Sequence, residues 1–220
     1  MKREIIITKD GSTTIHLTDL NETYHSKFGA IQEAQHVFIK CGLDLIQTSS
    51  VSILEVGFGT GLNAFITLLE AEKRKQNINY VGVEAFPIEN SEVESLNYTT
   101  SLNVEDKQDL FLSLHNRPWE EKNVIAEYFS LEKRKQFFKD IKDVDAYNLI
   151  YFDAFGFNVQ PELWGTEIFK IMFDSLQDQG ILVTYACRSS IKKAMIEVGF
   201  TVEKLPGAPG KREMLRAIKK

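Results

Sequence analysis

The 220-residue sequence is poor in the residues that build covalent or metal-stabilised folds. Its only two cysteines, Cys41 and Cys187, lie far apart and form no CxxC pair, so neither a disulfide scaffold nor a thiolate zinc site is expected. The four histidines show neither HxxxH nor HExxH spacing. The sequence therefore predicts no metal site.

Long apolar runs are missing as well. No stretch approaches the ~20 apolar residues that a membrane span requires, and the N-terminal MKREIIITKD lacks the apolar core of a signal peptide. We therefore expect a cytoplasmic protein without a membrane partner. Hydrophobic residues make up 43% of the chain and charged residues 26%, proportions that are typical of globular proteins and argue against disorder.

Charge is distributed unevenly along the chain. Residues 188–220 carry nine Lys and Arg against three Glu, whereas the first 187 residues carry 17 basic and 28 acidic side chains. A solvated basic tail is the simple interpretation. The alternative is a basic edge on an acidic body, which suits a polyanion that approaches from one side.

The N-terminal part differs in pattern from the rest. Residues 5–8 and 14–17 flank an Asp10-Gly11 turn and predict a β-hairpin, and apolar residues then recur at helical spacing between Ile31 and Leu45. We expect residues 1–48 to form an extension, made of this hairpin and helix, that packs on a main domain over residues 49–220.

The main domain alternates between strand and helix patterns. Strands are expected at 51–56, 80–83, 147–152 and 181–185, and helices at 62–75, 161–176 and 189–199. This alternation predicts an α/β, doubly wound, mostly parallel sheet. Two last strands, 201–205 and 213–218, follow each other without a helix and predict an antiparallel pair at the sheet edge.

Residues 104–140 give no clear pattern. They contain an apolar, aromatic segment near residues 128–131 and the charge run Lys133-Arg134-Lys135. We interpret the charge run as a solvated loop or helix face.

A glycine-rich bend, GFGTG, follows the strand expected at 51–56. In doubly wound sheets, ligands bind beyond the carboxyl ends of the strands. Gly57, Gly59 and Gly61 allow the backbone to approach a ligand closely, and the first amides of the next helix point to the same place. The bend therefore predicts a ligand site.

Glycine spacing discriminates between cofactors. A dinucleotide fingerprint, GxGxxG, needs its third glycine at position 62, where this sequence has Leu62. The observed ExGxGxG suits a nucleoside without a pyrophosphate, and Glu55 would repel a diphosphate. The pattern points to S-adenosylmethionine, with Glu55 organising loop amides or meeting the ammonium of the cofactor. Glu84 is placed to accept both ribose hydroxyls, and Asp140 to receive an adenine amino group.

Asp153 ends the strand at 147–152, beside the glycine bend. This position makes it the candidate for accepting a hydrogen bond from a substrate amine, orienting its lone pair and receiving its proton. Phe155, Phe157 and Trp164 follow and are suited to wall the pocket or to stack on an exposed base. Packing in the core is the alternative for Trp164.

Lys211 and Arg212 follow two prolines and a glycine on an exposed-looking loop. Such a place suits contact with a phosphate of a substrate. The alternative for Arg212 is an ion pair with Glu213 or with an internal acid.

Several motifs together are characteristic of one family. They are ETYHS (22–26), LEVGFGTGLN (54–63), VEAF (83–86), YFDAF (151–155), QPELW (160–164) and GKREML (210–215). In these stretches the sequence resembles the methyltransferase domain of the MnmC family, the bacterial bifunctional enzymes that complete 5-methylaminomethyl-2-thiouridine at the tRNA wobble position.

The resemblance implies a class I, Rossmann-like methyltransferase with a seven-stranded sheet and S-adenosyl-L-methionine as cofactor. It implies tRNA as the partner and N-methylation of 5-aminomethyl-(2-thio)uridine as the reaction. Further cofactor contacts implied by the matching stretches are Tyr24, Ser26, Phe58, Thr60, Asn63, Ala85, Phe86 and Asp153. The flavin-dependent domain that the family can carry is missing, so we expect a stand-alone methyltransferase.

Three other functions are compatible with the sequence. They are a methyltransferase of the same fold acting on a small-molecule or protein amine, an aminopropyltransferase, and a non-catalytic adenosyl-binding module.

Overall fold

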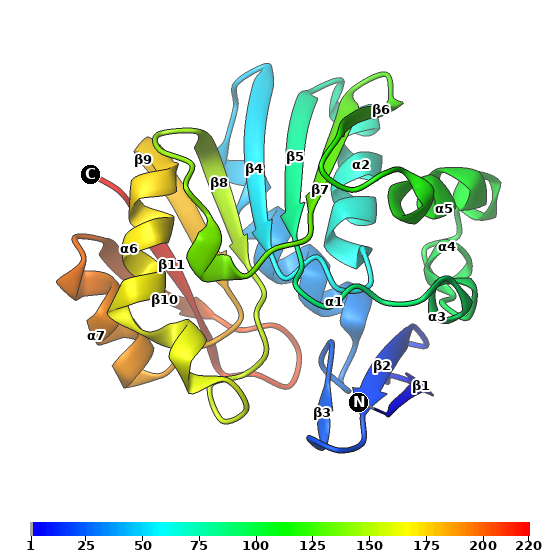
Figure 1. Ribbon diagram of the computed structural model, residues 1–220, viewed down its shortest axis with the longest axis horizontal. Helices are drawn as coiled ribbons and strands as arrows, with labels where there is room; N and C mark the ends of the chain where they lie inside the picture. The colour runs from blue at the N-terminus through cyan, green and yellow to red at the C-terminus, as the bar shows by residue number, and fades with distance from the viewer. Residues whose placement is uncertain (1) are drawn as a thin grey trace.

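A large β-sheet with helices on both faces forms the framework of the protein (Figure 1). The structure is a computed structural model that describes residues 2–220. The strand order is β10 (Thr201–Pro206), β11 (Glu213–Ile218), β9 (Leu176–Thr184), β8 (Tyr147–Phe152), β4 (Ser50–Val56), β5 (Asn77–Val83), β7 (Phe129–Arg134) and β6 (Lys122–Ala126). The five strands from β9 to β7 are parallel, and β10, β11 and β6 are each antiparallel to their neighbours. The predicted α/β fold and its antiparallel C-terminal edge are therefore confirmed.

The sheet has eight strands, so the expected number of seven was wrong. Neither β6 nor β7 was among the strand ranges expected from the sequence, and β6 pairs with β7 through an irregular register. Strand β6 is the harder of the two to recognise. Its Val124 is 74% exposed, and this lack of a buried face explains why no apolar pattern marks the strand.

The interpretation of the charge run at residues 133–135 as a solvated loop or helix face was wrong for Lys133. It lies in β7, where buried and part-buried residues alternate, and only 1% of it is exposed. Its ammonium donates to the His115 carbonyl and lies 4.8 Å from the centre of the Trp119 ring. Alternation along a strand thus places a lysine inside the protein.

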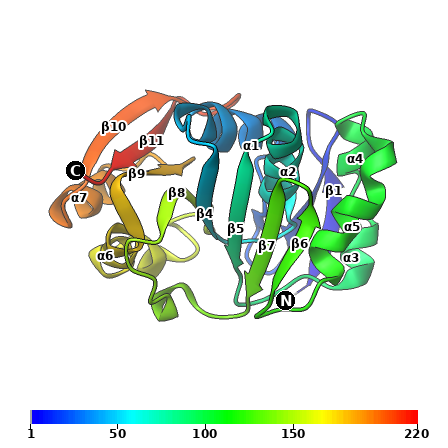
Figure 2. The same cartoon turned by 90° about the horizontal axis from the view of Figure 1, so that it is seen from above.

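Helices cover the two faces of the sheet (Figure 2). One face carries α1 (Ala30–Ala34), the wide-turn helix η1 (Gln35–Lys40), α2 (Leu62–Arg74) and α5 (Gln108–Asn116); the other carries α6 (Thr166–Ser175) and α7 (Ser189–Glu197). Short helices make up the connections: η2 (Leu43–Leu45), α3 (Asn90–Glu94), α4 (Tyr98–Ser101), η3 (Glu105–Lys107), η4 (Phe138–Asp140) and η5 (Pro161–Trp164). No helix among residues 2–220 combines the length and apolarity needed to span a bilayer.

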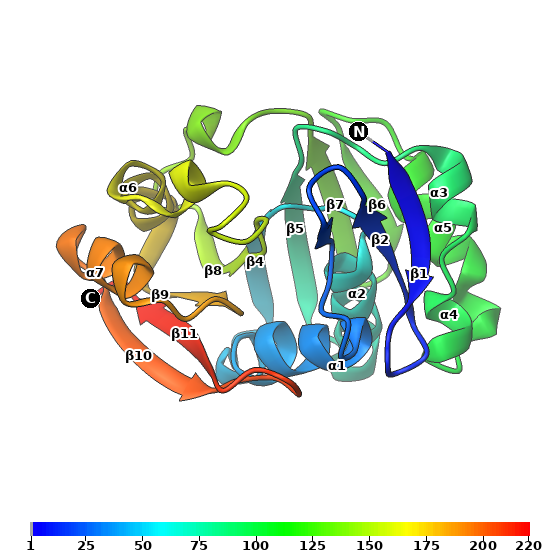
Figure 3. The same cartoon turned by 90° about the horizontal axis from the view of Figure 1, so that it is seen from below.

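A second, three-stranded antiparallel sheet lies at the N-terminus. It consists of β1 (Arg3–Ile7), β2 (Thr13–Leu17) and β3 (Glu22–Thr23), and confirms the predicted hairpin. Figure 3 shows this sheet beside α3, α4 and α5. Arg3 pairs with Glu92 at 2.9 Å, and the Thr13 amide donates to the side chain of Asn97 at 2.8 Å. The division of the chain at residues 48 and 49 stays a prediction.

Candidate active site

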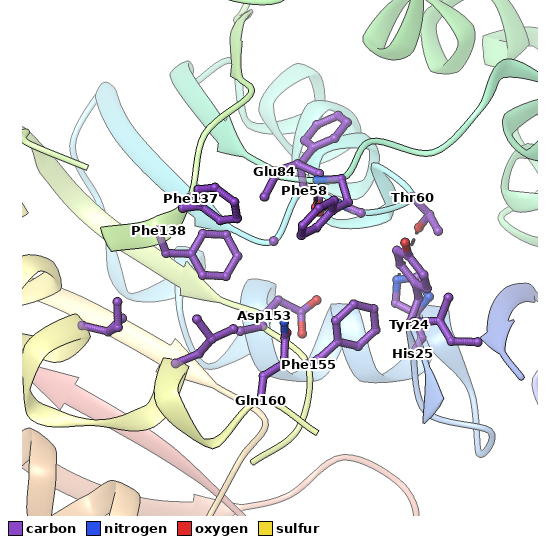
Figure 4. Close-up of a pocket in the computed structure, with 18 of the residues that line it drawn as sticks. Tyr24, His25, Phe58, Thr60, Glu84, Phe137, Phe138, Asp153, Phe155 and Gln160 are labelled. Atoms are coloured by element: carbon purple, nitrogen blue, oxygen red, sulfur yellow. Dashed lines mark hydrogen bonds between the residues drawn. The ribbon is translucent and has the colours of Figure 1, made fainter. Parts of the chain in front are cut away.

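A cavity of about 460 Å³ opens at the carboxyl ends of β4, β5 and β8 (Figure 4). This is the edge where doubly wound sheets bind ligands. The N-terminal sheet, the glycine bend, the segment after β5, the turn before η4 and the chain from β8 to α6 all contribute walls. The lining residues are Arg3, Leu17, Leu20, Tyr24, His25, Gly57, Phe58, Gly59, Thr60, Leu62, Asn63, Glu84, Ala85, Phe86, Phe137, Phe138, Lys139, Asp153, Ala154, Phe155, Gln160, Glu162, Leu163, Glu167 and Ile168.

The glycine bend forms the floor of the cavity. Gly57 and Gly59 have φ angles of +96° and +50°, values that glycine adopts readily. A Cβ at Gly57 would lie 2.6 Å from the Asp153 carbonyl oxygen, and one at Gly59 would lie 3.1 Å from the Tyr24 ring. These glycines therefore let β4, β8 and the N-terminal sheet meet closely beneath a ligand.

Glu84 stands at the end of β5 with its carboxylate tied to the bend. One oxygen accepts the Gly59 amide at 3.1 Å, and the other accepts the Phe86 amide at 2.9 Å. Each carboxylate oxygen has a second lone pair. Glu84 can therefore accept further donors from a ligand while it holds the loop.

Asn63 joins two carboxyl groups, those of Asp153 and Glu55. Its amide nitrogen donates to Asp153 Oδ2 at 2.8 Å and to Glu55 Oε1 at 2.9 Å. Glu55 is fully buried and does not reach the cavity surface. Its carboxyl group accepts a hydrogen bond from Asn63, and none of the hydrogen bonds among residues 2–220 joins it to a loop amide, contrary to one of our two expectations. Its contact with the ammonium of the cofactor stays a prediction.

Both carboxyl groups bind protons more tightly than usual. Burial raises the pKa of Asp153 to about 7, and nearby Glu33 adds to the rise, while the hydrogen bond from Asn63 and the charge of Lys211 oppose it. Burial also raises the pKa of Glu55 well above its ordinary value. Burial thus favours the uncharged form of Glu55, and Asp153 can gain or lose a proton near neutral pH.

Eleven of the predicted site residues line this cavity. They are Tyr24, Gly57, Phe58, Gly59, Thr60, Asn63, Glu84, Ala85, Phe86, Asp153 and Phe155. Figure 4 shows Asp153 and Phe155 on one side and Phe58 and Glu84 opposite them. The structure thus brings most of the predicted cofactor residues and the predicted catalytic carboxylate into one space.

The other predicted residues lie elsewhere for identifiable reasons. Trp164 is 1% exposed, packs on Phe152 and donates its indole N–H to the Phe155 carbonyl at 2.8 Å, so it belongs to the core. Asp140 is exposed at the end of η4 and does not line the cavity. The Ser26 amide donates to Glu33, which holds Ser26 outside the lining.

Gly61 likewise lies outside the cavity lining. It precedes α2, and a Cβ there would lie 2.8 Å from His115 Nε2. Phe157, Lys211 and Arg212 line a second cavity, of about 540 Å³.

Several lining residues escaped prediction. His25 is half-buried between Thr14 and Thr60, and the loss of solvent around its ring lowers its pKa to about 4, so it is a neutral wall residue. Its place inside the ETYHS motif was the available signal. Phe137 and Phe138 come from the unassigned region, where the only signal was their position just before Asp140.

The cavity suits a nucleoside cofactor. Phe86 and Phe137 are 58% and 52% exposed, and their ring centres lie 5.9 Å apart in an edge-to-face arrangement at the rim. Such apolar rings beside the Glu84 carboxylate match the two faces of an adenosine, a flat base and a sugar diol. Among residues 2–220, no group of three or more His, Cys, Asp or Glu is placed to hold a metal.

The chain is similar to known proteins. Residues 126–220 match the model of a family of S-adenosyl-L-methionine-dependent methyltransferases. The chain is 28% identical over 210 residues to tRNA 5-methylaminomethyl-2-thiouridine biosynthesis bifunctional protein MnmC from Burkholderia multivorans, covering 88% of this chain and 32% of that protein. The protein of the same name from Delftia acidovorans is 26% identical over 211 residues, covering 90% of this chain and 32% of its own length. The chain thus spans about a third of these curated relatives.

A solved structure extends the likeness to three dimensions. MnmC2 from Aquifex aeolicus matches 100% of this chain and 70% of its own, with a TM-score of 0.82 and 25% identity. Fold, cavity and family match define the chain as a class I methyltransferase whose cofactor is S-adenosyl-L-methionine. Its particular counterpart is the methyltransferase part of MnmC, and the resemblance predicted from the motifs is confirmed.

Proposed function

We propose that this protein transfers a methyl group to the amine of 5-aminomethyluridine, with or without the 2-thio group, at the wobble position of tRNA. The observation that carries the proposal is the Asp153 carboxylate, which reaches the cofactor cavity with a pKa of about 7. The similarity to MnmC over about nine-tenths of the chain supports tRNA as the substrate.

Cofactor binding uses the glycine bend and the end of β5. The backbone of Gly57 and Gly59 would lie against the cofactor, Glu84 would accept its ribose hydroxyls, and Phe86 would cover its base. When bound, S-adenosyl-L-methionine supplies a methyl group activated by a positive sulfur. The protein has to orient the amine, exclude water and take up a proton.

Deprotonation of the amine is the task that fits Asp153. A primary alkylamine has an ordinary pKa near 10, so it arrives mainly as an ammonium that cannot attack. A cavity with apolar walls lowers that pKa while it raises the pKa of Asp153, which brings the two closer together. Asn63 occupies Oδ2, and Oδ1 of Asp153 is the atom that would accept the amine proton.

The substrate base would enter between aromatic residues. The Tyr24 and Phe155 rings lie edge to face with their centres 5.0 Å apart, and both line the cavity next to Asp153. Extruded RNA bases are commonly held by aromatic side chains in this way. Such a wall would hold the uridine ring while its aminomethyl group points to Asp153.

The experiment is to incubate the purified protein with S-adenosyl-L-methionine and tRNA from cells that lack the wobble methyl group. Nucleoside mass spectrometry should then show 5-aminomethyluridine converted to 5-methylaminomethyluridine. Methylation of free amines or of proteins, with the tRNA left unchanged, would replace this proposal by the small-molecule or protein alternative. Binding of the cofactor without any transfer would favour the non-catalytic adenosyl-binding module.

A further inference from the structure

The second cavity borders the first one across a short piece of chain. Residues 153–155 line the first cavity, and the next three residues, 156–158, line the second. The Tyr185 hydroxyl fixes this dividing segment by donating to the Ala154 carbonyl at 2.9 Å. A polymer with one unit in the first cavity would therefore place an adjacent unit at the second.

Three cationic residues line the second cavity: Arg188, Lys211 and Arg212. Two acids, Glu22 and Glu213, line it as well, but Glu213 is paired with Lys204 at 2.9 Å. Positive charge thus exceeds negative charge at this opening, which favours an anionic occupant.

Not all basic residues of the segment 188–220 are free to attract an anion. Of the nine basic residues in 188–220, four form ion pairs with acids: Lys204, Lys211, Arg216 and Lys219. Lys211 pairs with Glu33 and lies 3.8 Å from the centre of the Tyr185 ring. The basic edge predicted from the sequence is therefore neutralised only in part, and Arg188 and Arg212 remain as the exposed cations that line the second cavity.

Arg188 is held in place by uncharged neighbours. Its Nη1 donates to the Asn158 side-chain oxygen at 2.6 Å, and its guanidinium carbon lies 4.6 Å from the centre of the Phe157 ring. Neither contact cancels the charge of Arg188 or uses up its remaining N–H donors. A planar cation stacked on an aromatic ring suits a phosphate together with a nucleobase.

We propose that the second cavity binds the nucleotide next to the modified uridine, with its phosphate on Arg188 and Arg212 and its base against the stacked Arg188 and Phe157. This inference rests on the proposed function, because it takes single-stranded RNA as the polymer that passes both cavities. It gives Phe157 and Arg212 a role at the flanking nucleotide, and Lys211 a supporting one.

The test is a double-mutant cycle between protein and RNA. Anticodon stem-loops carrying 5-aminomethyluridine are prepared with a neutral methylphosphonate at either of the two linkages that flank this uridine. Affinities for wild type, Arg188→Gln and Arg212→Gln are measured by fluorescence anisotropy with S-adenosylhomocysteine present. Lys122→Gln, on the opposite sheet edge in β6, is the matched control for loss of one positive charge.

We expect the methylphosphonate at one linkage to weaken wild-type binding about ten-fold, as for one charge-assisted contact. The same methylphosphonate should reduce the RNA affinity of Arg188→Gln only slightly, because this variant has already lost the contact with that phosphate. The control Lys122→Gln should lose as much affinity as wild type does. The inference would be overturned if, at both linkages, the methylphosphonate reduced the RNA affinity of wild type and of both arginine variants by the same factor. Unchanged affinity for S-adenosylhomocysteine verifies that the variants fold.

The two proposals can fail separately. Methylation of the unmodified-backbone stem-loop by wild-type protein tests the proposed function. If that reaction proceeds and the cycle shows no coupling, only the assignment of the second cavity is wrong. If no stem-loop is methylated or bound, the proposed function itself is wrong.

Discussion

The amide nitrogen of Asn63 lies 2.8 Å from Asp153 Oδ2, and its second hydrogen bond goes to Glu55. One neutral side chain thus donates to two neighbouring carboxyl groups, one of them fully buried. This relationship links the first turn of helix α2, which follows the glycine bend, to the proposed catalytic residue. It orients Asp153 and opposes the rise in its pKa that burial causes.

Replacing Asn63 by Ala should therefore act on the pH profile as well as on stability. The hydrogen bond that lowers the pKa of Asp153 is lost, so the acidic limb of kcat should move to higher pH. Leaving the two carboxyl groups without this donor should cost about 1–3 kcal/mol in the free energy of unfolding. Asn90→Ala, at an exposed position, is the control; an unshifted limb in Asn63→Ala would contradict the positioning role.

Asp153→Asn should reduce turnover and yet stabilise the protein at alkaline pH. Unfolded aspartate has a pKa near 3.9, whereas the folded value is about 7. Between these values the folded state keeps a proton that the unfolded state has released, so the free energy of unfolding falls as pH rises through this window. Above pH 7 the folded protein bears the full free-energy cost of an ionised Asp153. The Asn variant carries no charge at this position and does not bear that cost.

We expect Asp153→Asn to lower kcat by at least ~100-fold and to keep cofactor affinity within a few-fold. At pH 8 its unfolding free energy should exceed that of wild type by an amount on the order of 2–4 kcal/mol. Urea unfolding at pH 8 and at pH 4 measures the difference, which should vanish at the lower pH. Full turnover in the variant would remove Asp153 from the mechanism.

Much of the lining of the candidate site could be predicted because its signals are local. The glycines of the bend and the acidic residues at strand ends are visible within one strand–helix unit. The hydrophobic period fixes where each strand stops, which brings Glu84 and Asp153 to the same edge. The local sequence pattern was sufficient to predict lining residues wherever those residues lie close together both in the sequence and in space.

The remaining features depend on contacts between distant segments. Lys133 is buried by pairing of β7 with β5 and by packing against Trp119. The local sequence around Lys133 predicts neither of these two contacts. Asp140 was expected at the cofactor base, but the turn of η4 leaves it exposed and places Phe137 and Phe138 at the cavity instead. The pairing of Lys211 with Glu33 joins opposite ends of the chain and is likewise invisible in either segment.

Glu84→Gln should weaken cofactor binding. The amide cannot accept two backbone N–H groups and two ribose hydroxyls as a carboxylate does. One of the amides of Gly59 and Phe86 loses its acceptor, and the other keeps only an uncharged one. We expect the affinity for S-adenosylhomocysteine, measured by calorimetry, to fall at least ~10-fold, which is one charge-assisted hydrogen bond. Asp140→Asn should bind as wild type, and a comparable loss there would restore its expected role at the adenine.

Gly57→Ala should disrupt both the fold of the bend and the cofactor site. The φ angle of +96° is strained for alanine, and the new Cβ would lie 2.6 Å from the Asp153 carbonyl oxygen, a backbone atom that cannot rotate away. We expect a loss of about 2 kcal/mol or more in the free energy of unfolding, with cofactor binding lost by calorimetry. Gly165→Ala is the matched control, because its φ is −94° and its nearest neighbour would be 3.9 Å away. If both variants bind the cofactor equally well, close approach at Gly57 is not what shapes the site.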